Sequence, residues 1–234
     1  MIIEDPRIDP LEWNFALSLC DLDPELIKLA NKECLLSSTY EPSSKTKMKL
    51  RAAPGAGTMY LQSECAEALA ELFAGAEEAG YKLYLKSAYR AYKTQKTMYN
   101  NRLERNNGKD DGWVSKPGAS DHQTGLGCDV VPGSWKDKSM NSNMASTPEC
   151  QWMAEHCYEY GFVIRYPEDK QDITEINYEP WHLRYVGKEV ARYIWRNGLC
   201  LEEFHEQLQA AIDAYLAAGG DARRVEDLIQ TSAE

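Results

Sequence analysis

Residues 115–131 read Ser115-Lys-Pro-Gly-Ala-Ser-Asp-His122-Gln-Thr-Gly-Leu-Gly-Cys-Asp129-Val-Val131. The stretch begins as a turn-rich loop and ends in a short apolar run, Cys128 to Val131, which predicts a buried strand. His122 and Asp129 bracket two glycines, whose backbone can bend and approach neighbouring chain closely. An imidazole and a carboxylate at this junction between loop and strand are two possible ligands of a metal ion.

A second pair of candidate ligands lies in Glu179-Pro180-Trp181-His182. Pro180 disfavours a helix through Glu179, and a β-turn with Pro180 at its second position would bring Glu179 and His182 to the same side. Taken alone, either pair is a weak signal, and a structural explanation such as a capped loop and a surface charge is favoured over a metal site. Together, two histidines and one aspartate are three ligands with a position left for water, which indicates a catalytic zinc. Glu179 is then the carboxylate available as a general base.

Arg90 follows a predicted strand in the run Ser87-Ala88-Tyr89-Arg90. An arginine in this place is often a surface or ion-paired residue without a catalytic role. Its functional interpretation is a guanidinium directed at an oxyanion or at a substrate carboxylate. The residues alone leave both interpretations open.

A serine nucleophile is the alternative chemistry. Ser44-Lys45-Thr46-Lys47 matches SxxK, and Ser139-Met140-Asn141 resembles the SxN box of penicillin-binding enzymes. No Lys-Thr-Gly follows these motifs, and Ser44 lies in a predicted loop, so we interpret the match as chance. GxSxG, P-loop and GxGxxG motifs are also missing from the sequence.

Composition limits the class of protein. The 234 residues suffice for one domain with a sizeable core, and the formal charge of −11 argues against a nucleic-acid or anionic-membrane surface. No apolar run reaches the ~20 residues of a membrane helix. Residues 1–20 lack the basic region and the apolar region of a secretory signal peptide, so we expect a cytoplasmic protein or one whose export segment lies outside this chain.

The seven cysteines are an odd number without CxxC spacing, which argues against a structural zinc cluster and a small disulfide scaffold. We expect buried free thiols, with one or two disulfides as the alternative outside the cytoplasm.

Periodicity and turn residues predict the order of the elements. Helices are expected at 24–29, 60–80, 93–105, 148–160, 188–197 and 201–217, and strands at 81–88, 128–131 and 162–164. A hairpin is expected at 168–176 and a rim loop at 134–147. Because helices and strands mix without regular βαβ alternation, the fold class is α+β. The domain organisation expected is an arm at 1–24, a catalytic domain at 25–217 and a tail at 218–234.

Four blocks of the sequence resemble the VanY-type zinc D-alanyl-D-alanine carboxypeptidases, a family that also contains peptidoglycan L,D-carboxypeptidases. The blocks follow the family's order between about residues 25 and 205, and they are 87–90 with Gln95, 117–129, 160–167 and 178–187. The resemblance implies a small central antiparallel sheet flanked by helices, with zinc in a groove over the sheet, as in the D-Ala-D-Ala (LAS-type) metallopeptidases.

The same resemblance implies a role for each matching residue. It makes His122, Asp129 and His182 the zinc ligands, Glu179 the catalytic base and Arg90 the group that stabilises the transition state. It assigns substrate binding to Ser120 and Gln95, which would hold the terminal residue, and to Tyr89 and Trp181 in the same blocks. The chain departs from the family pattern at Asp121, Gly127 and Ala88, none of which is a proposed ligand. His156 and His205 are expected to lie outside the site.

The resemblance therefore implies a zinc carboxypeptidase that removes the C-terminal D-alanine from peptidoglycan stem peptides. The alternatives are an L,D-carboxypeptidase that trims tetrapeptide stems and a catalytically silent cell-wall-binding module. A monomer that binds stem peptides and no nucleic acid is expected. Its location is expected to be extracytoplasmic, in the cell envelope, with a cytoplasmic protein as the alternative.

Overall fold

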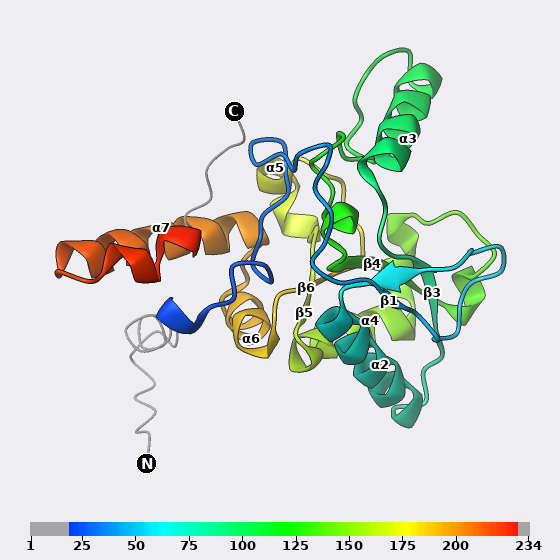
Figure 1. Ribbon diagram of the computed structural model, residues 1–234. Helices are drawn as coiled ribbons and strands as arrows, with labels where there is room; N and C mark the ends of the chain where they lie inside the picture. Colours follow the sequence, from blue (N-terminus) through cyan, green and yellow to red (C-terminus); the bar gives the residue numbers. More distant parts are fainter. Residues whose placement is uncertain (1–18, 229–234) are drawn as a thin grey trace.

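The centre of the molecule is a four-stranded antiparallel sheet (Figure 1). The computed structural model describes residues 19–228, so most of the expected arm and the last residues of the expected tail lie outside the described part. The strands follow the order β3-β4-β6-β5, with bounds of Leu83–Ser87 for β3, Gly127–Pro132 for β4, His182–Tyr185 for β6 and Phe162–Ile164 for β5. A short antiparallel ladder of β1 (Thr46–Lys47) and β2 (Tyr60–Leu61) lies apart from this sheet. The α+β class with a small antiparallel sheet flanked by helices is confirmed.

Strand β4 is the centre of the sheet and is buried along its whole length. It pairs with β3 on one side and β6 on the other, so both of its edges are hydrogen-bonded. In β6 the side chains alternate: Leu183 and Tyr185 belong to the main hydrophobic core, whereas His182 and Arg184 point to the opposite face. This second face of the sheet carries the polar residues of the site.

Helices α2 (Ser63–Glu78) and α4 (Pro148–His156) contribute to the main core on the apolar face of the sheet. The apolar side of α2 recurs at helical spacing through Leu69, Leu72 and Phe73, all of which are buried. Gly80 follows the helix with φ +86°, a left-handed conformation that glycine adopts without steric penalty.

A second core forms between the last helices and the chain that precedes the sheet. Helices α6 (Lys188–Asn197) and α7 (Leu201–Ala217) bury Ile194, Phe204 and Leu208 against Ile27 from the N-terminal segment. The 3₁₀ turns η7 (Ala222–Arg224) and η8 (Glu226–Leu228) follow α7, and Val225 and Leu228 are buried in the same cluster.

Helix α3 (Tyr92–Arg105) projects from the body of the molecule (Figure 1). Gln95 is its only buried residue, in contrast to the apolar faces of α2 and α7. The remaining elements are short: α5 (Gln171–Thr174) and the 3₁₀ turns η1 (Leu19–Asp21), η2 (Asp121–Thr124), η3 (Gly133–Trp135), η4 (Ser142–Ser146), η5 (Cys157–Tyr160) and η6 (Glu168–Lys170).

Two of the expected elements are wrong, and a third, the helix expected at 60–80, begins later than predicted. The predicted hairpin at 168–176 consists of η6 and α5, because Pro167 and the acidic pair after it begin a helical turn. The predicted helix at 24–29 is a turn closed by Leu26 and Ile27, whose amides donate to the Asp23 carbonyl. Residues 60–61 pair as β2 before α2 begins, so the helix is shorter than its apolar pattern.

Six of the seven cysteines have described side chains, and each of the six is a free thiol. Five are buried, and burial raises the pKa of Cys150 to about 11 and of Cys200 to about 12. The expectation of buried free thiols is confirmed for these five. Among residues 19–228, none of the helices combines the length and the apolar character that crossing a bilayer requires.

Candidate active site

A cavity of about 420 Å³ lies over the polar face of the sheet. Its wall is formed by residues from α3, the loop before β4, β4 itself, the rim loop and the turn before β6. They are Arg90, Gln95, Met98, Arg102, Trp113, Val114, Ser115, Ser120, His122, Asp129, Met140, Asn141, Tyr166, Glu179, Trp181 and His182. The two stretches that predicted a site, 115–131 and 179–182, therefore both line one cavity.

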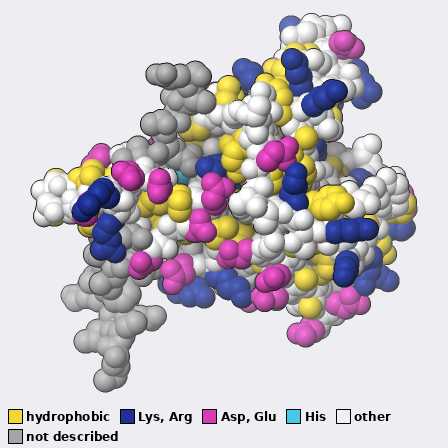
Figure 2. Space-filling view, viewed as in Figure 1, with side chains coloured by type: hydrophobic (Ala, Val, Ile, Leu, Met, Phe, Trp, Pro, Cys, Tyr) yellow, Lys and Arg dark blue, Asp and Glu magenta, His cyan; other side chains and the backbone are white. Residues whose placement is uncertain are grey.

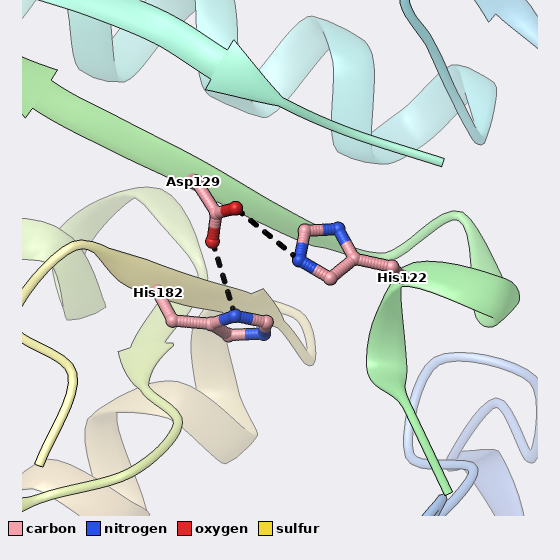
Figure 3. A group of neighbouring side chains, drawn as sticks. All are labelled: His122, Asp129 and His182. Atoms are coloured by element: carbon pink, nitrogen blue, oxygen red, sulfur yellow. Dashed lines mark ion pairs between the residues drawn. The ribbon is translucent and has the colours of Figure 1, made fainter. Parts of the chain in front are cut away.

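The register of the sheet brings the first two candidate ligands together. Asp129 of β4 is the direct cross-strand partner of His182 in β6, so both side chains leave the same face (Figure 3). The Asp129 Oδ1 and His182 Nδ1 atoms are 3.2 Å apart. Both side chains are buried, with 3% of each residue exposed.

The third candidate ligand comes from η2, the turn that leads into β4. His122 Nε2 lies 3.4 Å from Asp129 Oδ2, on the other side of the carboxylate from His182 (Figure 3). Its Nδ1 lies 2.7 Å from the carbonyl oxygen of Ala88, which can only accept a hydrogen bond. Nδ1 therefore carries the proton, and the Nε2 lone pair is directed to the centre of the group.

Two glycines allow η2 to lie this close to the sheet. Gly125 ends the turn with φ +71°, in the left-handed region. A Cβ added to Gly127 would lie 2.9 Å from atoms of Asp121, so a side chain there would push η2 away. The bend and the close approach of neighbouring backbone that were expected at these two glycines are confirmed.

The three ligand atoms lie within 4.8 Å of one another, and the group fits a zinc ion. Two imidazole nitrogens and one carboxylate oxygen are the donors of catalytic zinc sites. Asp129 Oδ1 is buried and accepts no hydrogen bond from the described residues. Burial alone would raise the pKa of the Asp129 carboxyl, but the neighbouring rings of His122 and His182 hold that pKa well below its usual value. The pKa of His122 is lowered, first by burial and then by the charge of Arg90. Both residues are thus in the protonation states that bind metal.

Glu179 lies at the edge of this group. The turn predicted around Pro180 is confirmed, because the His182 amide donates to the Glu179 carbonyl at 3.1 Å. It brings the Glu179 carboxylate to 3.5 Å from His182 Nδ1. Burial, with Asp129 as a second cause, raises the pKa of Glu179 well above its usual value, which Arg90 opposes. A carboxyl group of this kind takes up a proton more readily than an exposed one.

Arg90 is held on the cavity wall from three directions. Its amide donates to the His122 carbonyl at 2.9 Å, while Nη1 donates to Gln95 Oε1 at 2.8 Å and Nη2 to Ser87 Oγ at 3.1 Å. Burial lowers its pKa, and the nearby charges of Asp129 and Glu179 oppose this shift. The guanidinium is therefore a fixed positive charge directed at the candidate metal group, unlike a surface arginine.

Eight of the nine predicted site residues line the cavity. Ser120 is buried at its wall, and Trp181 stacks on Trp113 with ring centroids 6.3 Å apart. Gln95 uses both ends of its amide within the protein, since Nε2 donates to the Ser115 carbonyl at 2.6 Å. Tyr89 does not line the cavity, because its hydroxyl donates to Glu41 at 2.8 Å on the protein surface.

Sequence reasoning missed much of the outer cavity wall. Tyr166 lies within a block that resembles the family, so that block contained a usable signal. Met140 and Asn141 belong to the predicted rim loop, whose position at the cavity is confirmed. Met98 and Arg102 are on the exposed side of a polar helix, where no local pattern marks a cavity.

A buried ion network supports η2 from below. Arg165 Nε donates to Asp121 Oδ2 at 2.6 Å, and Nη1 and Nη2 donate to the two carboxylate oxygens of Glu202 at 2.8 and 2.6 Å. Arg184 Nη1 donates to the other Asp121 oxygen, and its Nη2 donates to two backbone carbonyls, at Leu26 and Lys28. The residue beside His122 is thereby linked to α7 and to the N-terminal segment.

The remaining two histidines lie outside the site, as expected. His156 Nδ1 is 2.8 Å from Glu159 at the surface, and His205 Nε2 donates to the Ile27 carbonyl at 2.6 Å in the second core. Ser44, the alternative nucleophile, accepts a hydrogen bond from the Ser63 amide and does not line the cavity.

The site is thus a buried group of two histidines and one aspartate that could hold a metal ion, with a carboxylate and an arginine beside it. The chain belongs to the VanY family, whose model is described as D-alanyl-D-alanine carboxypeptidase and matches residues 58–188. The putative carboxypeptidase YodJ of Bacillus subtilis is 39% identical over 80% of this chain and 70% of its own length. A D-alanyl-D-alanine carboxypeptidase of Enterococcus faecalis is 34% identical over 58% of this chain, which spans about half of that relative.

Solved structures share the fold. The LdcB LD-carboxypeptidase superposes with a TM-score of 0.72 at 40% identity, covering 78% of this chain and 87% of its own. The vancomycin-resistance D,D-pentapeptidase VanY, solved as a mutant in complex with Zn(II), superposes with a TM-score of 0.64 at 28% identity, covering 77% of this chain and 98% of its own.

Proposed function

We propose that this protein is a zinc-dependent carboxypeptidase that removes the C-terminal D-alanine from peptidoglycan stem peptides. The observation that carries the proposal is the buried group of His122, Asp129 and His182 with Glu179 and Arg90 beside it. Membership of the VanY family supports the carboxypeptidase activity, and the Zn(II) complex of a structural relative supports the metal.

In this proposal His122, Asp129 and His182 hold the metal through Nε2, a carboxylate oxygen and Nδ1. Zinc, when bound, supplies a Lewis acid that polarises the carbonyl and makes water more acidic. Glu179 takes the proton from the attacking water and returns it to the leaving amine. Arg90 stabilises the negative charge that develops on the carbonyl oxygen of the cleaved bond.

Binding of the terminal residue is assigned to the buried wall beside the metal group. Ser120 carries a hydroxyl that can donate to the carboxylate of the leaving D-alanine. Gln95 holds the Arg90 guanidinium through its Oε1 atom, so it supports the substrate site by positioning Arg90. Trp181 would form an apolar wall, whereas Tyr89 does not line the cavity and donates its hydroxyl to Glu41, so no binding role is proposed for it.

The second candidate is an L,D-carboxypeptidase that acts on tetrapeptide stems. The 40% identity and TM-score of 0.72 with the LdcB LD-carboxypeptidase favour it. The complex of VanYB with D-alanine-D-alanine, at 28% identity and a TM-score of 0.63, favours the D,D activity. A silent binding module would not need a buried carboxylate with a raised pKa at the metal group, and Glu179 therefore argues against it.

The substrate also bears on location and assembly. Because assembled peptidoglycan lies outside the cytoplasmic membrane, we propose that the protein acts in the cell envelope, as a monomer that binds stem peptides.

Mass spectrometry of the products from a synthetic pentapeptide and a tetrapeptide tests the proposal. With zinc, the D,D enzyme releases one D-alanine from the pentapeptide and stops, whereas the L,D enzyme acts on the tetrapeptide. A chelator should abolish either reaction, and Glu179→Gln should lower kcat by about 10²–10⁴ while zinc binding persists. Release of D-alanine at the wild-type rate by Glu179→Gln would show that this carboxylate is not the base.

A further inference from the structure

Helix α3 has an exposure that packing does not explain. It is 14 residues long, buries only Gln95, and projects from the body beside the mouth of the cavity (Figure 1). A helix that buries a single residue gains little from packing, so its presence at this place points to a binding role.

The charge of α3 is opposite to that of the protein. Four basic residues and one acidic residue give it a net charge of +3, in a chain whose net charge is −11. Figure 2 shows the dark blue side chains gathered on this projecting helix, whereas magenta acidic side chains are more frequent over the lower body. A basic element at the mouth of a cavity attracts anionic ligands.

One side of α3 continues the cavity wall outward. Gln95, Met98 and Arg102 all line the cavity and are spaced three and four residues apart, so they lie on one face of the helix. Arg105 is the next position on that face. At a rise of 1.5 Å per residue, Arg102 lies about 10 Å and Arg105 about 15 Å along the helix from Gln95.

At its N-terminal end this face of α3 contacts Arg90, because Gln95 Oε1 accepts a hydrogen bond from the Arg90 guanidinium. Met98 follows as an apolar side chain that is 39% exposed. Arg102 is oriented by Asp111, to which Nε and Nη2 donate at 2.6–3.1 Å. In the described part of the chain, Nη1 of Arg102 forms no hydrogen bond and Arg105 no ion pair, so both can bind an anion.

We propose that α3 binds the part of the substrate N-terminal to the cleaved bond, and that Arg102 and Arg105 select peptides with a free carboxylate there. An extended peptide rises about 3.3 Å per residue, so Arg102 lies beside the third residue before the cleaved bond and Arg105 one or two residues further. The substrate class is then an acidic stem peptide, and its amidated form binds more weakly. This inference rests on the proposed function.

The test compares wild type with Arg102→Gln/Arg105→Gln and with the charge-conserving Arg102→Lys/Arg105→Lys. The matched control is Arg192→Gln/Arg196→Gln, which removes two exposed arginines from α6, away from the cavity. The substrates are two pentapeptides that differ only in whether the side carboxylate of the third residue before the cleaved bond is free or amidated.

The expected result is a KM for the acidic peptide that rises about fivefold to tenfold in Arg102→Gln/Arg105→Gln, the size of two lost exposed ion pairs, with kcat unchanged. The amidated peptide and the α6 control should show no change, the lysine variant should retain most of the affinity, and the effect should shrink at high salt. Equal losses for both peptides, or none, would overturn the proposal.

Calorimetric titration of both peptides into Glu179→Gln reads binding without turnover. If no peptide is cleaved by the wild type but the acidic peptide still binds through the α3 arginines, the proposed function fails while the inference stands. If inorganic polyphosphate binds through the same arginines and the acidic peptide does not, α3 recognises an anionic polymer and the proposal is wrong.

Discussion

At the scale of single residues, the site depends on protonation and orientation as much as on residue type. The carbonyl of Ala88 places the proton of His122 on Nδ1, which leaves Nε2 facing the Asp129 carboxylate. His182 is the cross-strand partner of Asp129 and faces the same carboxylate with its Nδ1 atom. In the proposed site each histidine thus offers a different ring nitrogen to the position that a metal ion would take. A substitution at a neighbouring residue that turned one of the imidazole rings would impair the site as strongly as the loss of that histidine.

We expect purified protein to carry about one zinc per chain, and His122→Ala or His182→Ala to lose it on dialysis. Two ligands alone leave too few donors to retain the ion. Metal analysis by mass spectrometry measures this, with His156→Ala as a control, because its ring contacts Glu159 at the surface. Full zinc occupancy in the His122 variant would disprove the ligand assignment.

Arg90→Lys should separate two roles of the guanidinium. A lysine ammonium lacks the planar guanidinium whose two Nη atoms donate to Gln95 and Ser87, so its charge would be held less firmly and it could not bind a carboxylate with two parallel hydrogen bonds. If Arg90 stabilises the oxyanion, kcat should fall by about 10²-fold or more with little change in KM. If it binds the terminal carboxylate, steady-state kinetics should show mainly a raised KM, and an amidated C-terminus should affect wild type more than the variant.

At the scale of elements, helix α7 supports η2, the turn that carries His122, although the two are far apart in sequence. Glu202 in its first turn neutralises Arg165, which holds Asp121 beside His122. All three residues are buried and form ion pairs with one another, and Arg184 and Asn31 complete the network through Asp121 and Glu202 respectively. If the Glu202 carboxylate were removed, Arg165 would keep its hydrogen bond to Asp121 but would lose the two that its Nη atoms donate to Glu202.

Glu202→Ala should therefore destabilise the protein by about 3–5 kcal/mol, the usual cost of leaving a buried charge without its partner. Urea unfolding monitored by circular dichroism measures this difference. Glu206→Ala, an exposed position on the same helix, should change stability by less than about 0.5 kcal/mol. A similar small effect for both variants would mean that the network does not depend on α7.

At the scale of the whole molecule, two cores share one sheet and meet at the polar network below the site. The first joins the sheet to α2 and α4, and the second joins α6 and α7 to the N-terminal segment. His205 is partly buried beside the second core, where its ring contacts Phe204 and donates to the Ile27 carbonyl. Burial lowers the pKa of His205 to about 4, and the positive charges of Arg184 and Arg165 contribute to this shift.

His205 should make stability depend on pH. The unfolded chain protonates this residue near pH 6.5 and the folded protein only near 4, so the unfolded state binds more protons between these values. Stability is then complete above pH 6.5 and falls by on the order of 2–3 kcal/mol as pH drops to 4. Denaturant unfolding at several pH values should show a shallower decline for His205→Gln, and parallel curves would exclude His205 as the cause.

The sequence by itself determined the local elements and the types of residue in the site. The helices at 188–197 and 201–217 follow from local signals and from the glycines after them, and the polar helix at 93–105 and the short apolar strand at 162–164 were also predicted, because these signals act over a few residues. The turn through Pro180 also follows from local chemistry, since proline restricts its own backbone and that of Glu179.

Only the tertiary structure decided how these parts work together. The register that places Asp129 opposite His182, the pairing of Glu202 with Arg165 and the cavity-facing side of α3 all join segments that are distant in the sequence. The hairpin expected at 168–176 is wrong because Pro167 and the acidic pair after it begin a helical turn, and the helix expected at 24–29 is only a turn closed on the Asp23 carbonyl. Strand register and buried ion pairs are set by which surfaces meet, and local periodicity carries no information about that meeting.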